Sequence, residues 1–202
     1  QRGLHKQEKS CAKYKVSDCE KSFKTESPLA VKCGGIMLDV NKTTLKGVYL
    51  VKPAAHKDAR GNFYETYNEK EYKAAGLAAD FVQDDISCSV KGVLKGMHGD
   101  AGTYKLVQCV HGSVYAVILN CDEASDEFGK WEAFELSAEN RYQIYIPPMY
   151  GNGYYVTSQE AVYSYKQSTY YGEYKQFTYK WNDDRFCIRW PGAAQVISKR
   201  DA

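Results

Sequence analysis

The sequence predicts an all-β domain, a sandwich or closed barrel, with one clear helix. Short runs rich in β-branched and aromatic residues recur along the chain, and turn-forming stretches such as "DEFGK", "SAEN" and "PPMYGNG" separate them. Many short strands at regular spacing are typical of sandwiches and barrels. The composition agrees, because 18 of the 202 residues are Tyr, a residue that suits pleated, half-buried surfaces.

The expected elements follow one another from residue 47. The first strand, 47–53, alternates apolar and polar residues, and the second, 62–67, follows a "DARG" turn. Residues 69–76 form the one convincing helix, which Gly76 ends because glycine tolerates the left-handed conformation at a helix C-terminus. Further strands are expected at 80–90, 92–99, 104–110, 112–121, 130–137, 142–148, 153–158 and 161–168. The segment from Phe177 onward is less regular and should wrap around the barrel.

The beginning of the chain differs in composition from the rest. Residues 1–32 carry eight Lys or Arg against four Asp or Glu, whereas the remainder carries 19 against 21. We therefore predict a basic N-terminal extension, 1–44, that is partly disordered and has a short strand near 35–40. Residues 45–202 are then the folded domain, long enough to bury one core.

Several classes of protein are disfavoured by the composition. A net charge of +2 is too near neutral to indicate nucleic acid or an anionic membrane as a partner. The chain has no run of about 18 apolar residues, the length that spans a bilayer. Its seven cysteines are odd in number and form no C-x-x-C pair, which favours reduced thiols in a cytoplasmic protein.

One residue stands out, because His98 lies in the middle of the expected strand 92–99. Lys95 and Lys105 lie nearby in sequence on adjacent expected strands, and their side chains could face the same interior. An interior that holds His, Lys and several Tyr is a better ligand cavity than a hydrophobic core. The sequence has no H-x-H pair, P-loop, G-x-G-x-x-G or G-x-S-x-G. No metal and no cofactor is therefore expected, and acid–base chemistry by His98 remains.

A series of ordered segments resembles the dTDP-4-dehydrorhamnose 3,5-epimerase family. The resemblance runs from Gly47 to Asp201 and rests on "DARGNFYETYNEKEY", "FVQDDISCSVKGVLKGMHGD", "YKLVQCVHGSVYAV", "FGKWEAFELSAENRYQIYIPP", "EAVYSYKQSTYYGEY", "YKWNDDRFCIRWP" and "VISKRD". It implies a cupin-like jelly-roll barrel with one or two short helices. It also implies a homodimer without metal or cofactor, and a nucleotide-linked 4-keto-6-deoxy sugar as substrate.

The resemblance assigns four catalytic roles. The family's base, in "R-G-L-H", corresponds to His98 in "K-G-M-H", and the Asp that orients it corresponds to Asp201 in "SKRD". The family's acid corresponds to Tyr165 in "SYK", and its Lys before "LV" to Lys105. These residue types suit an epimerisation, because a 4-keto group makes the hydrogens on C3 and C5 acidic. A base on one face and an acid on the other would invert either centre, with Lys105 stabilising the enolate.

The resemblance also implies a substrate-binding set. Its members are Arg60, Phe63 and Glu65, which would meet the nucleotide and its phosphates across the dimer, Gln83 and Asp85, and Tyr171, which would stack on the base.

Three positions depart from the family pattern. Lys95 replaces an Arg, Gly99–Asp100 replaces "Y-Q" after the base, and Asn152 replaces a His. Lys95 and Asn152 still belong to the expected substrate-binding set. Lys95 can neutralise a phosphate but cannot form a bidentate fork. This version is more similar to relatives acting on GDP-linked 4-keto-6-deoxy-heptoses of capsule pathways, so GDP is preferred over dTDP. Inversion at C3, C5 or both is left open.

Two other functions compete with the epimerase. A 3,4-ketoisomerase of the same barrel type would need proton transfer on one face, which Tyr165 opposite His98 disfavours. A non-catalytic sugar-nucleotide-binding barrel is disfavoured because the four expected catalytic residues are all present.

Overall fold

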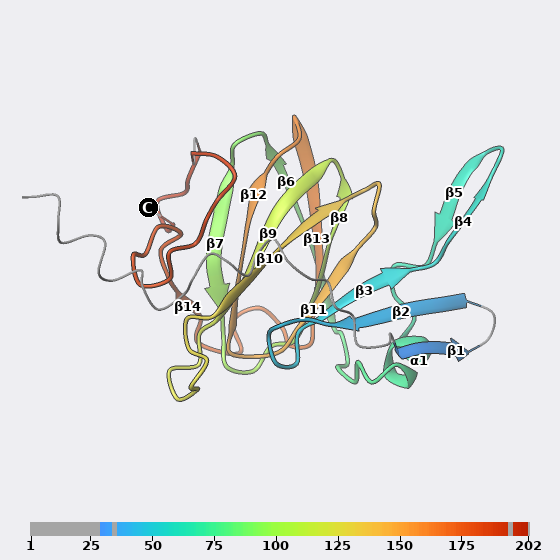
Figure 1. The fold of residues 1–202 in the computed structure, drawn as a ribbon, viewed down its shortest axis with the longest axis horizontal. Helices are drawn as coiled ribbons and strands as arrows, with labels where there is room; N and C mark the ends of the chain where they lie inside the picture. Colours follow the sequence, from blue (N-terminus) through green and yellow to red (C-terminus); the bar gives the residue numbers. More distant parts are fainter. Residues whose placement is uncertain (1–28, 34–35, 194–195, 202) are drawn as a thin grey trace, which may run out of the picture.

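The strands of the chain form two facing antiparallel sheets, as expected of a jelly roll (Figure 1). The computed structural model describes residues 29–33, 36–193 and 196–201. The larger sheet has the order β1 (Leu29–Cys33), β2 (Ile36–Lys42), β3 (Tyr49–Pro53), β11 (Gln143–Ile146), β8 (Lys105–His111), β13 (Glu160–Gln167) and β6 (Gln83–Val90). The smaller sheet has the order β10 (Trp131–Ser137), β9 (Ser113–Asn120), β12 (Tyr150–Val156), β7 (Leu94–Gly99) and β14 (Phe177–Thr178). The predicted all-β fold is therefore confirmed.

The core fills the space between the sheets. Val107, Ile118, Ile144 and Val156 pack there with Tyr163, all fully or almost fully buried. Burial of this apolar surface is the main favourable term for closing the sandwich. The core does not extend over the whole interior, because the edge strand β6 alternates half-buried polar with exposed residues. Its half-buried residues are Gln83, Asp85, Ser87 and Ser89.

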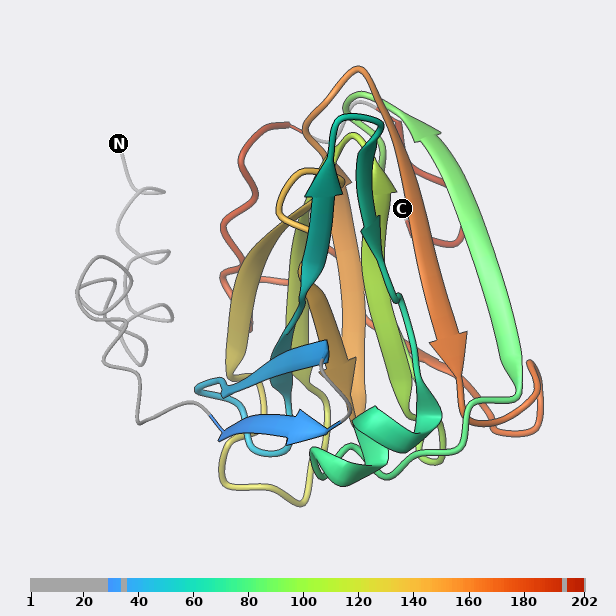
Figure 2. The same ribbon diagram turned by 90° about the vertical axis from the view of Figure 1, so that its right-hand side faces the viewer.

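Both outer faces are covered. The helix α1 (Glu69–Ala74) and the loop after it lie on the larger sheet, where Tyr72 and Leu77 pack with Leu106. Asn68 caps its N-terminus, and Gly76 follows with φ +86°, as predicted. The tail after β14 lies on the smaller sheet, where Phe186 packs with Met97 (Figure 2). The expectation that this segment wraps around the barrel is confirmed.

A bulge in β7 decides which side chains enter the interior. Lys95 is opposite Tyr154 and His98 is opposite Asn152, so three steps on β7 match two on β12. Lys95 and His98 therefore project to the same face, although simple alternation would separate them. Close approach at the bulge needs Gly96, where a Cβ would lie 2.4 Å from the Cα of Gly153.

The consecutive strands β7 and β8 lie in different sheets. Lys95 and Lys105 are therefore not on adjacent strands, as the sequence suggested, but on sheets that face each other.

A separate two-stranded hairpin, β4 (Ala55–Asp58) with β5 (Gly61–Tyr64), projects from the sandwich (Figure 1). All but one of its strand residues are exposed, Phe63 at 66%. The hairpin is therefore not part of the core.

The strand predicted near 35–40 is β2, which pairs with β3 in the larger sheet. The sheet thus begins before residue 45. The rest of the expected extension, residues 1–28, lies outside the described residues, so its separation from the domain stays a prediction.

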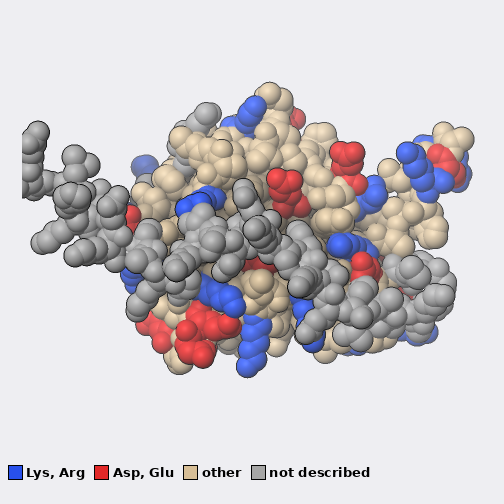
Figure 3. Space-filling view, viewed as in Figure 1, with Lys and Arg blue, Asp and Glu red and all other residues tan. Residues whose placement is uncertain are grey.

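The surface charges are mixed. On the face in Figure 3, acidic and basic side chains are interspersed among the described residues, in keeping with the net charge of +2. None of the helices in the described part is long and apolar enough to cross a membrane. Cys88, Cys109 and Cys121 are free thiols, whereas Cys187 takes part in a disulfide, which corrects the expectation of reduced thiols throughout.

Candidate active site

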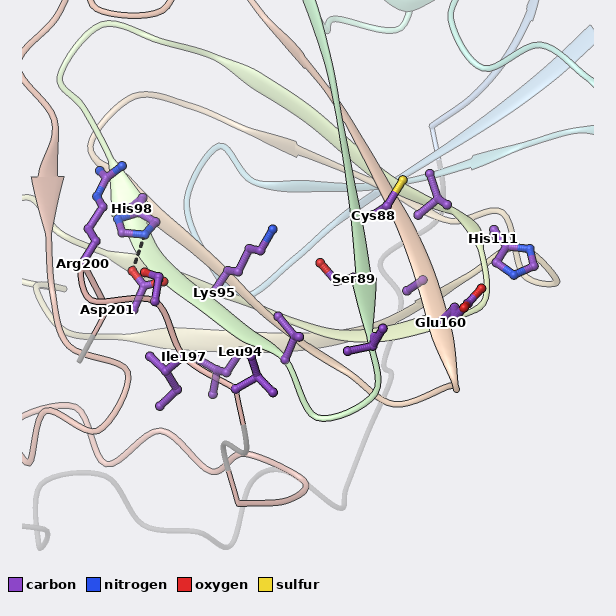
Figure 4. A pocket seen from close by; sticks show the side chains of 16 residues that line it. Cys88, Ser89, Leu94, Lys95, His98, His111, Glu160, Ile197, Arg200 and Asp201 are labelled. Atoms are coloured by element: carbon purple, nitrogen blue, oxygen red, sulfur yellow. Dashed lines mark hydrogen bonds and ion pairs between the residues drawn. The ribbon is translucent and has the colours of Figure 1, made fainter.

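A cavity of about 820 Å³ opens between the edge strand β6, strand β7 and the C-terminal segment 196–201. His98, Asp201 and Arg200 gather at one end, while His111 and Glu160 lie at the other (Figure 4). Lys95 lines the cavity between them. This volume is in the range of small-molecule sites.

The predicted pair His98 and Asp201 is in contact at one end of this cavity (Figure 4). Nε2 of His98 lies 2.6 Å from Oδ1 of Asp201, whose side chain is only 4% exposed. The two atoms are within ion-pair distance, but the geometry is not that of a hydrogen bond. Oδ1 of Asp201 is buried and accepts no hydrogen bond from the described residues. On its other side, Nδ1 of His98 lies 3.1 Å from the hydroxyl Oγ1 of Thr178. Both ring nitrogens therefore have a partner.

The carboxylate of Asp201 is held by its own segment. The Ser198 hydroxyl donates to Oδ2 of Asp201 at 3.0 Å, and the Asp201 backbone N–H donates to the Ser198 carbonyl. The segment is attached to the start of β7, where the Leu94 N–H donates to the Val196 carbonyl at 3.1 Å. These hydrogen bonds hold Asp201 beside His98.

The surroundings keep His98 neutral. Burial lowers its pKa below the usual 6.5, and the nearby cations Arg200 and Lys105 lower it further, against the opposing effect of Asp201. A neutral imidazole at neutral pH is the form that can remove a proton.

The facing sheet supplies two further groups. Tyr165 of β13 is half-buried against the core, and burial followed by the charge of Asp85 raises the pKa of its phenol. Lys105 of β8 is 9% exposed, and burial lowers the pKa of its ammonium group although Asp100 opposes this. Neither residue lines the cavity itself, but no hydrogen bond or ion pair engages either side chain within the described residues.

Gln83 and Asp85 form a network rather than an open binding surface. The amide groups of Gln83 and Gln167 both donate to Oδ2 of Asp85, each at 2.8 Å. The oxygen of Gln83 is thereby turned to the backbone N–H of Tyr171, which it accepts at 2.8 Å. The ring of Tyr171 is 67% exposed. The network thus fixes the loop that presents this aromatic ring.

Lys95 and Asn152 also have internal partners. Lys95 Nζ donates across the sandwich to the Ser87 hydroxyl at 2.6 Å, and the Tyr154 hydroxyl donates to the same oxygen at 3.0 Å. Asn152 exchanges hydrogen bonds with the hydroxyl of Tyr163, at 3.2 and 3.3 Å. Both departures from the family pattern are therefore accommodated by partners on the opposite sheet.

The predicted nucleotide-binding residues Arg60, Phe63 and Glu65 do not lie at this cavity. Arg60 is 91% exposed and pairs with Asp58 on the projecting hairpin, and Glu65 accepts from Asn68 beside α1. The hairpin of a chain therefore does not complete the cavity of the same chain.

Three residues at the site were missed from the sequence. Arg200 and Ser198 stand in the same "SKRD" segment as Asp201, so their adjacency was an available signal. Thr178 had no such signal, because it belongs to a two-residue strand in a segment without clear periodicity.

No group of three or more His, Cys, Asp or Glu that could hold a metal ion occurs in the part of the chain that the structure describes.

Comparison with known proteins shows to which family the chain belongs. The family model for dTDP-4-dehydrorhamnose 3,5-epimerase matches residues 42–202. The chain belongs to this family. Relatives with the same name come from Shigella flexneri, 38% identical over 81% of this chain and 93% of the relative, and from Escherichia coli K12, 37% identical over 79% and 89%.

Solved structures of the family agree. The dTDP-6-deoxy-D-glucose-3,5-epimerase of Legionella pneumophila, in complex with dTDP-4-keto-L-rhamnose, is 34% identical with a TM-score of 0.77, over 81% of this chain and 89% of that one. The dTDP-4-dehydrorhamnose 3,5-epimerase of Elizabethkingia anophelis is 40% identical with a TM-score of 0.75, over 81% and 93%. The protein is thus an enzyme of the isomerase class with a cupin-like fold.

Proposed function

We propose that this protein epimerises C3, C5 or both in a nucleotide-linked 4-keto-6-deoxy sugar. The observation that carries the proposal is the distribution of groups over the two sheets. The base and its carboxylate, His98 and Asp201, are on one side, and Tyr165 with Lys105 is on the facing sheet. Inversion needs proton removal on one face and return on the other, and this arrangement suits it.

The proposed steps conserve protons and electrons. Neutral His98 removes the proton from C3 or C5, and the electron pair moves into the C4 carbonyl to give an enolate. Lys105, with its ammonium group, stabilises the enolate oxygen. Tyr165 gives its phenolic proton to the opposite face of the carbon, and solvent restores the protonation states of both side chains. The raised pKa of Tyr165 keeps that proton in place until the enolate forms.

The nucleotide is a separate question. The relatives above are named for dTDP-linked sugars, which favours dTDP. The preference for GDP-linked heptoses rests on the departures from the family pattern at Lys95, Gly99 and Asn152. These departures change the side of the pocket that would bind the sugar and the diphosphate. We therefore propose dTDP as the nucleotide and keep GDP as the competing prediction.

Such a reaction belongs to deoxysugar biosynthesis for a surface polysaccharide, and we place it in the cytoplasm as part of the same proposal. We also propose a homodimer, because the projecting hairpin with Arg60 and Phe63 is exposed and none of its residues lines the cavity of its own chain. Across a two-fold axis, the hairpin of one copy would serve the site of the other.

Proton NMR in D₂O tests the function. With a dTDP-linked 4-keto-6-deoxy sugar, the C3 or C5 proton signal should disappear at a rate proportional to enzyme, and new signals of the inverted sugar should appear. His98→Asn should abolish exchange, whereas the matched control His111→Asn, at the far end of the cavity, should keep it.

The alternatives give different spectra. A GDP-linked sugar exchanging faster than the dTDP-linked one would reverse the nucleotide choice. Movement of the keto group from C4 to C3 would indicate a ketoisomerase. Binding without exchange for every sugar would leave a non-catalytic barrel.

A further inference from the structure

Asp85 and Tyr165 are cross-strand neighbours on the interior face of the larger sheet. In the antiparallel ladder between β6 and β13, Asp85 lies directly opposite Tyr165. Directly opposite residues project to the same side of a sheet, with their Cβ atoms about 5 Å apart. That side is the interior, because Tyr165 packs against the core and Asp85 is one of the half-buried residues of β6. The Asp85 carboxylate therefore lies beside the side chain that the proposed mechanism uses as its acid.

Two amides hold the Asp85 carboxylate in place. Nε2 of Gln83, on the same strand, and Nε2 of Gln167, on β13, both donate to Oδ2 of Asp85. Gln167 is 5% exposed, so this clamp is buried in the interior face of the sheet. Within the described residues, no hydrogen bond or ion pair engages Oδ1 of Asp85 or the hydroxyl of Tyr165. In this part of the chain, a carboxylate without a cation thus stands next to a phenol without a partner.

Asp85 is also the charged group that acts on the Tyr165 phenol. Burial makes the largest contribution to raising the pKa of Tyr165, and the Asp85 carboxylate makes the next. Tyr154 and Tyr171 raise it as well, but tyrosine side chains are uncharged at neutral pH. The titratable groups around Tyr165 are Asp85 on β6, Tyr154 on β12, Tyr163 on its own strand, Tyr171 in the following loop and Lys105 on β8.

We propose that Asp85, clamped by Gln83 and Gln167, is the positioning residue that keeps the phenolic proton on Tyr165. The inference deepens the proposed function and rests on it for its kinetic consequence. A tyrosinate at this position would place two negative charges side by side, which is unfavourable in a half-buried site. Asp85 therefore opposes loss of the phenolic proton to solvent. It also favours the return of a proton from solvent after Tyr165 has given its own to the enolate carbon.

Carbon-13 NMR of labelled tyrosine tests the effect of this charge without substrate. The Cζ signal of Tyr165, assigned with Tyr165→Phe, moves when the phenol ionises, and in Asp85→Asn this titration should shift to lower pH. Asparagine is a close replacement, because both amides donate to one oxygen of Asp85 and the asparagine oxygen can accept both. Asp85→Ser also removes the charge and replaces this variant if Asp85→Asn does not fold.

The matched control is Asp84→Asn on the same strand. Asp84 projects to the outer face of the sheet, where its 68% exposed carboxylate pairs with Lys166 at 2.7 Å. The substitution removes one negative charge from β6, as Asp85→Asn does, but on the side away from the phenol. The Tyr165 titration in Asp84→Asn should therefore coincide with that of the wild type.

The ratio of inversion to exchange tests the kinetic role. In D₂O, His98 exchanges the proton of C3 or C5 whether or not inversion follows, but inversion also needs the proton of Tyr165. The amount of inverted sugar per exchanged proton is therefore independent of how fast His98 and Lys105 form the enolate. As the pH rises, this ratio should fall at lower pH in Asp85→Asn than in the wild type and in Asp84→Asn.

The outcomes separate this inference from the proposed function. A Tyr165 titration that Asp85→Asn leaves in place, or that Asp84→Asn shifts equally, would overturn the inference. A shifted titration with an unchanged ratio would overturn the kinetic role. A raised KM with neither pH dependence changed would make Asp85 a substrate contact instead. Absence of any exchange in the wild type would remove the proposed epimerase, while the titration would still decide whether Asp85 keeps the proton on Tyr165.

Discussion

At the scale of single residues, the balance of charges around His98 determines when it can act as a base. Asp201 favours the imidazolium, whereas burial and the cations Arg200 and Lys105 favour neutral imidazole, and the latter effects prevail. The exposed guanidinium of Arg200 is the group that can be changed with least effect on packing.

The pH dependence of kcat/KM should follow from these shifts. Because the base acts when deprotonated, activity should fall only as the pH drops through a His98 pKa below 6.5. Arg200→Gln removes a cation that disfavours the imidazolium, so it should raise this pKa and move the acid limb to higher pH. Arg189→Gln, an exposed cation outside the cavity lining, should not move the limb. An unshifted limb in Arg200→Gln would show that solvent screens its charge from His98.

The alkaline limb of the pH profile of kcat/KM depends on groups other than His98. Tyr165 has its pKa raised above 10 and keeps its proton there, whereas burial lowers the pKa of Lys105 from 10.5. The alkaline limb should therefore report the loss of the ammonium charge of Lys105.

At the scale of elements, the short strand β14 depends on a glycine next to the base. A Cβ on Gly99 would lie 2.3 Å from the Tyr150 carbonyl oxygen and 2.6 Å from the ring of Phe177. The family's aromatic residue after the base is absent here, and the Phe177 ring occupies the space beside residue 99. This departure from the family pattern thus belongs to the same local arrangement that holds Thr178 opposite His98.

Gly99→Ala should therefore weaken both the fold and the site. Backbone atoms cannot move away cheaply, so overpacking should cost about 1–3 kcal/mol of unfolding free energy, and kcat should fall as β14 shifts. Thermal denaturation and turnover measure the two effects. Gly102→Ala is a suitable control, because the three atoms nearest to its Cβ would belong to the ring of Tyr174, a side chain rather than backbone and 45% exposed. Equal losses in both variants would contradict the account of β14.

At the scale of the whole molecule, the proposed dimer depends on where the hairpin of residues 55–64 lies relative to the cavity. His98 and Asp201 line the cavity, whereas the hairpin that carries the exposed Phe63 and Arg60 does not line it. The hairpin strands β4 and β5 project from the side of the sandwich away from β7 (Figure 1). An exposed aromatic residue beside a cation on a projecting hairpin is well suited to contact a nucleotide in another copy.

Co-expression of two inactive variants tests this assembly. His98→Asn lacks the base but keeps the hairpin, and a chain with Phe63→Ser and Arg60→Ala has the opposite defect. If hairpins serve the neighbouring copy, mixed dimers contain one complete site each, and the mixture should regain up to about a quarter of wild-type activity by random pairing. Activity no higher than that of the two variants measured separately would mean that the hairpin serves no site in the other copy.

Much of the fold was predictable from the sequence. Period-2 patterns and turn residues predicted the strands from β3 to β13 within a few residues, except the hairpin strand β4, and Asn68 and Gly76 bound the predicted helix. Alternation failed at β7, because a bulge places Lys95 and His98 on one face and no local pattern reveals it. The alternation of apolar and polar residues also could not show that β7 and β8 lie in opposite sheets. Which strands pair is decided by contacts between residues distant in sequence.

The candidate site was predictable in part. The pair of His98 with Asp201 came from a motif order and is found in contact, whereas composition alone would have left Asp201 unremarkable. Gln83 and Asp85 hold the Tyr171 loop through their own hydrogen bonds, and their contact with the substrate stays a prediction. Thr178 escaped prediction because its position depends on a backbone ladder of only two residue pairs.

The attachment of the segment 196–201 has a consequence for how the enzyme loses activity. Among the described residues, two backbone hydrogen bonds attach this segment to the sandwich, from Leu94 N–H to the Val196 carbonyl and from Val196 N–H to the Gly92 carbonyl. The sandwich itself is held by complete strand ladders and a buried core. Stability is not uniform across a protein, and weakly attached segments open before the whole molecule unfolds. Detachment of this short segment removes Asp201 from His98 and leaves the sheets intact. On the proposed mechanism, a preparation can therefore keep its full β-sheet circular dichroism and yet be inactive. Circular dichroism would then be a poor measure of how many molecules have His98 and Asp201 in contact.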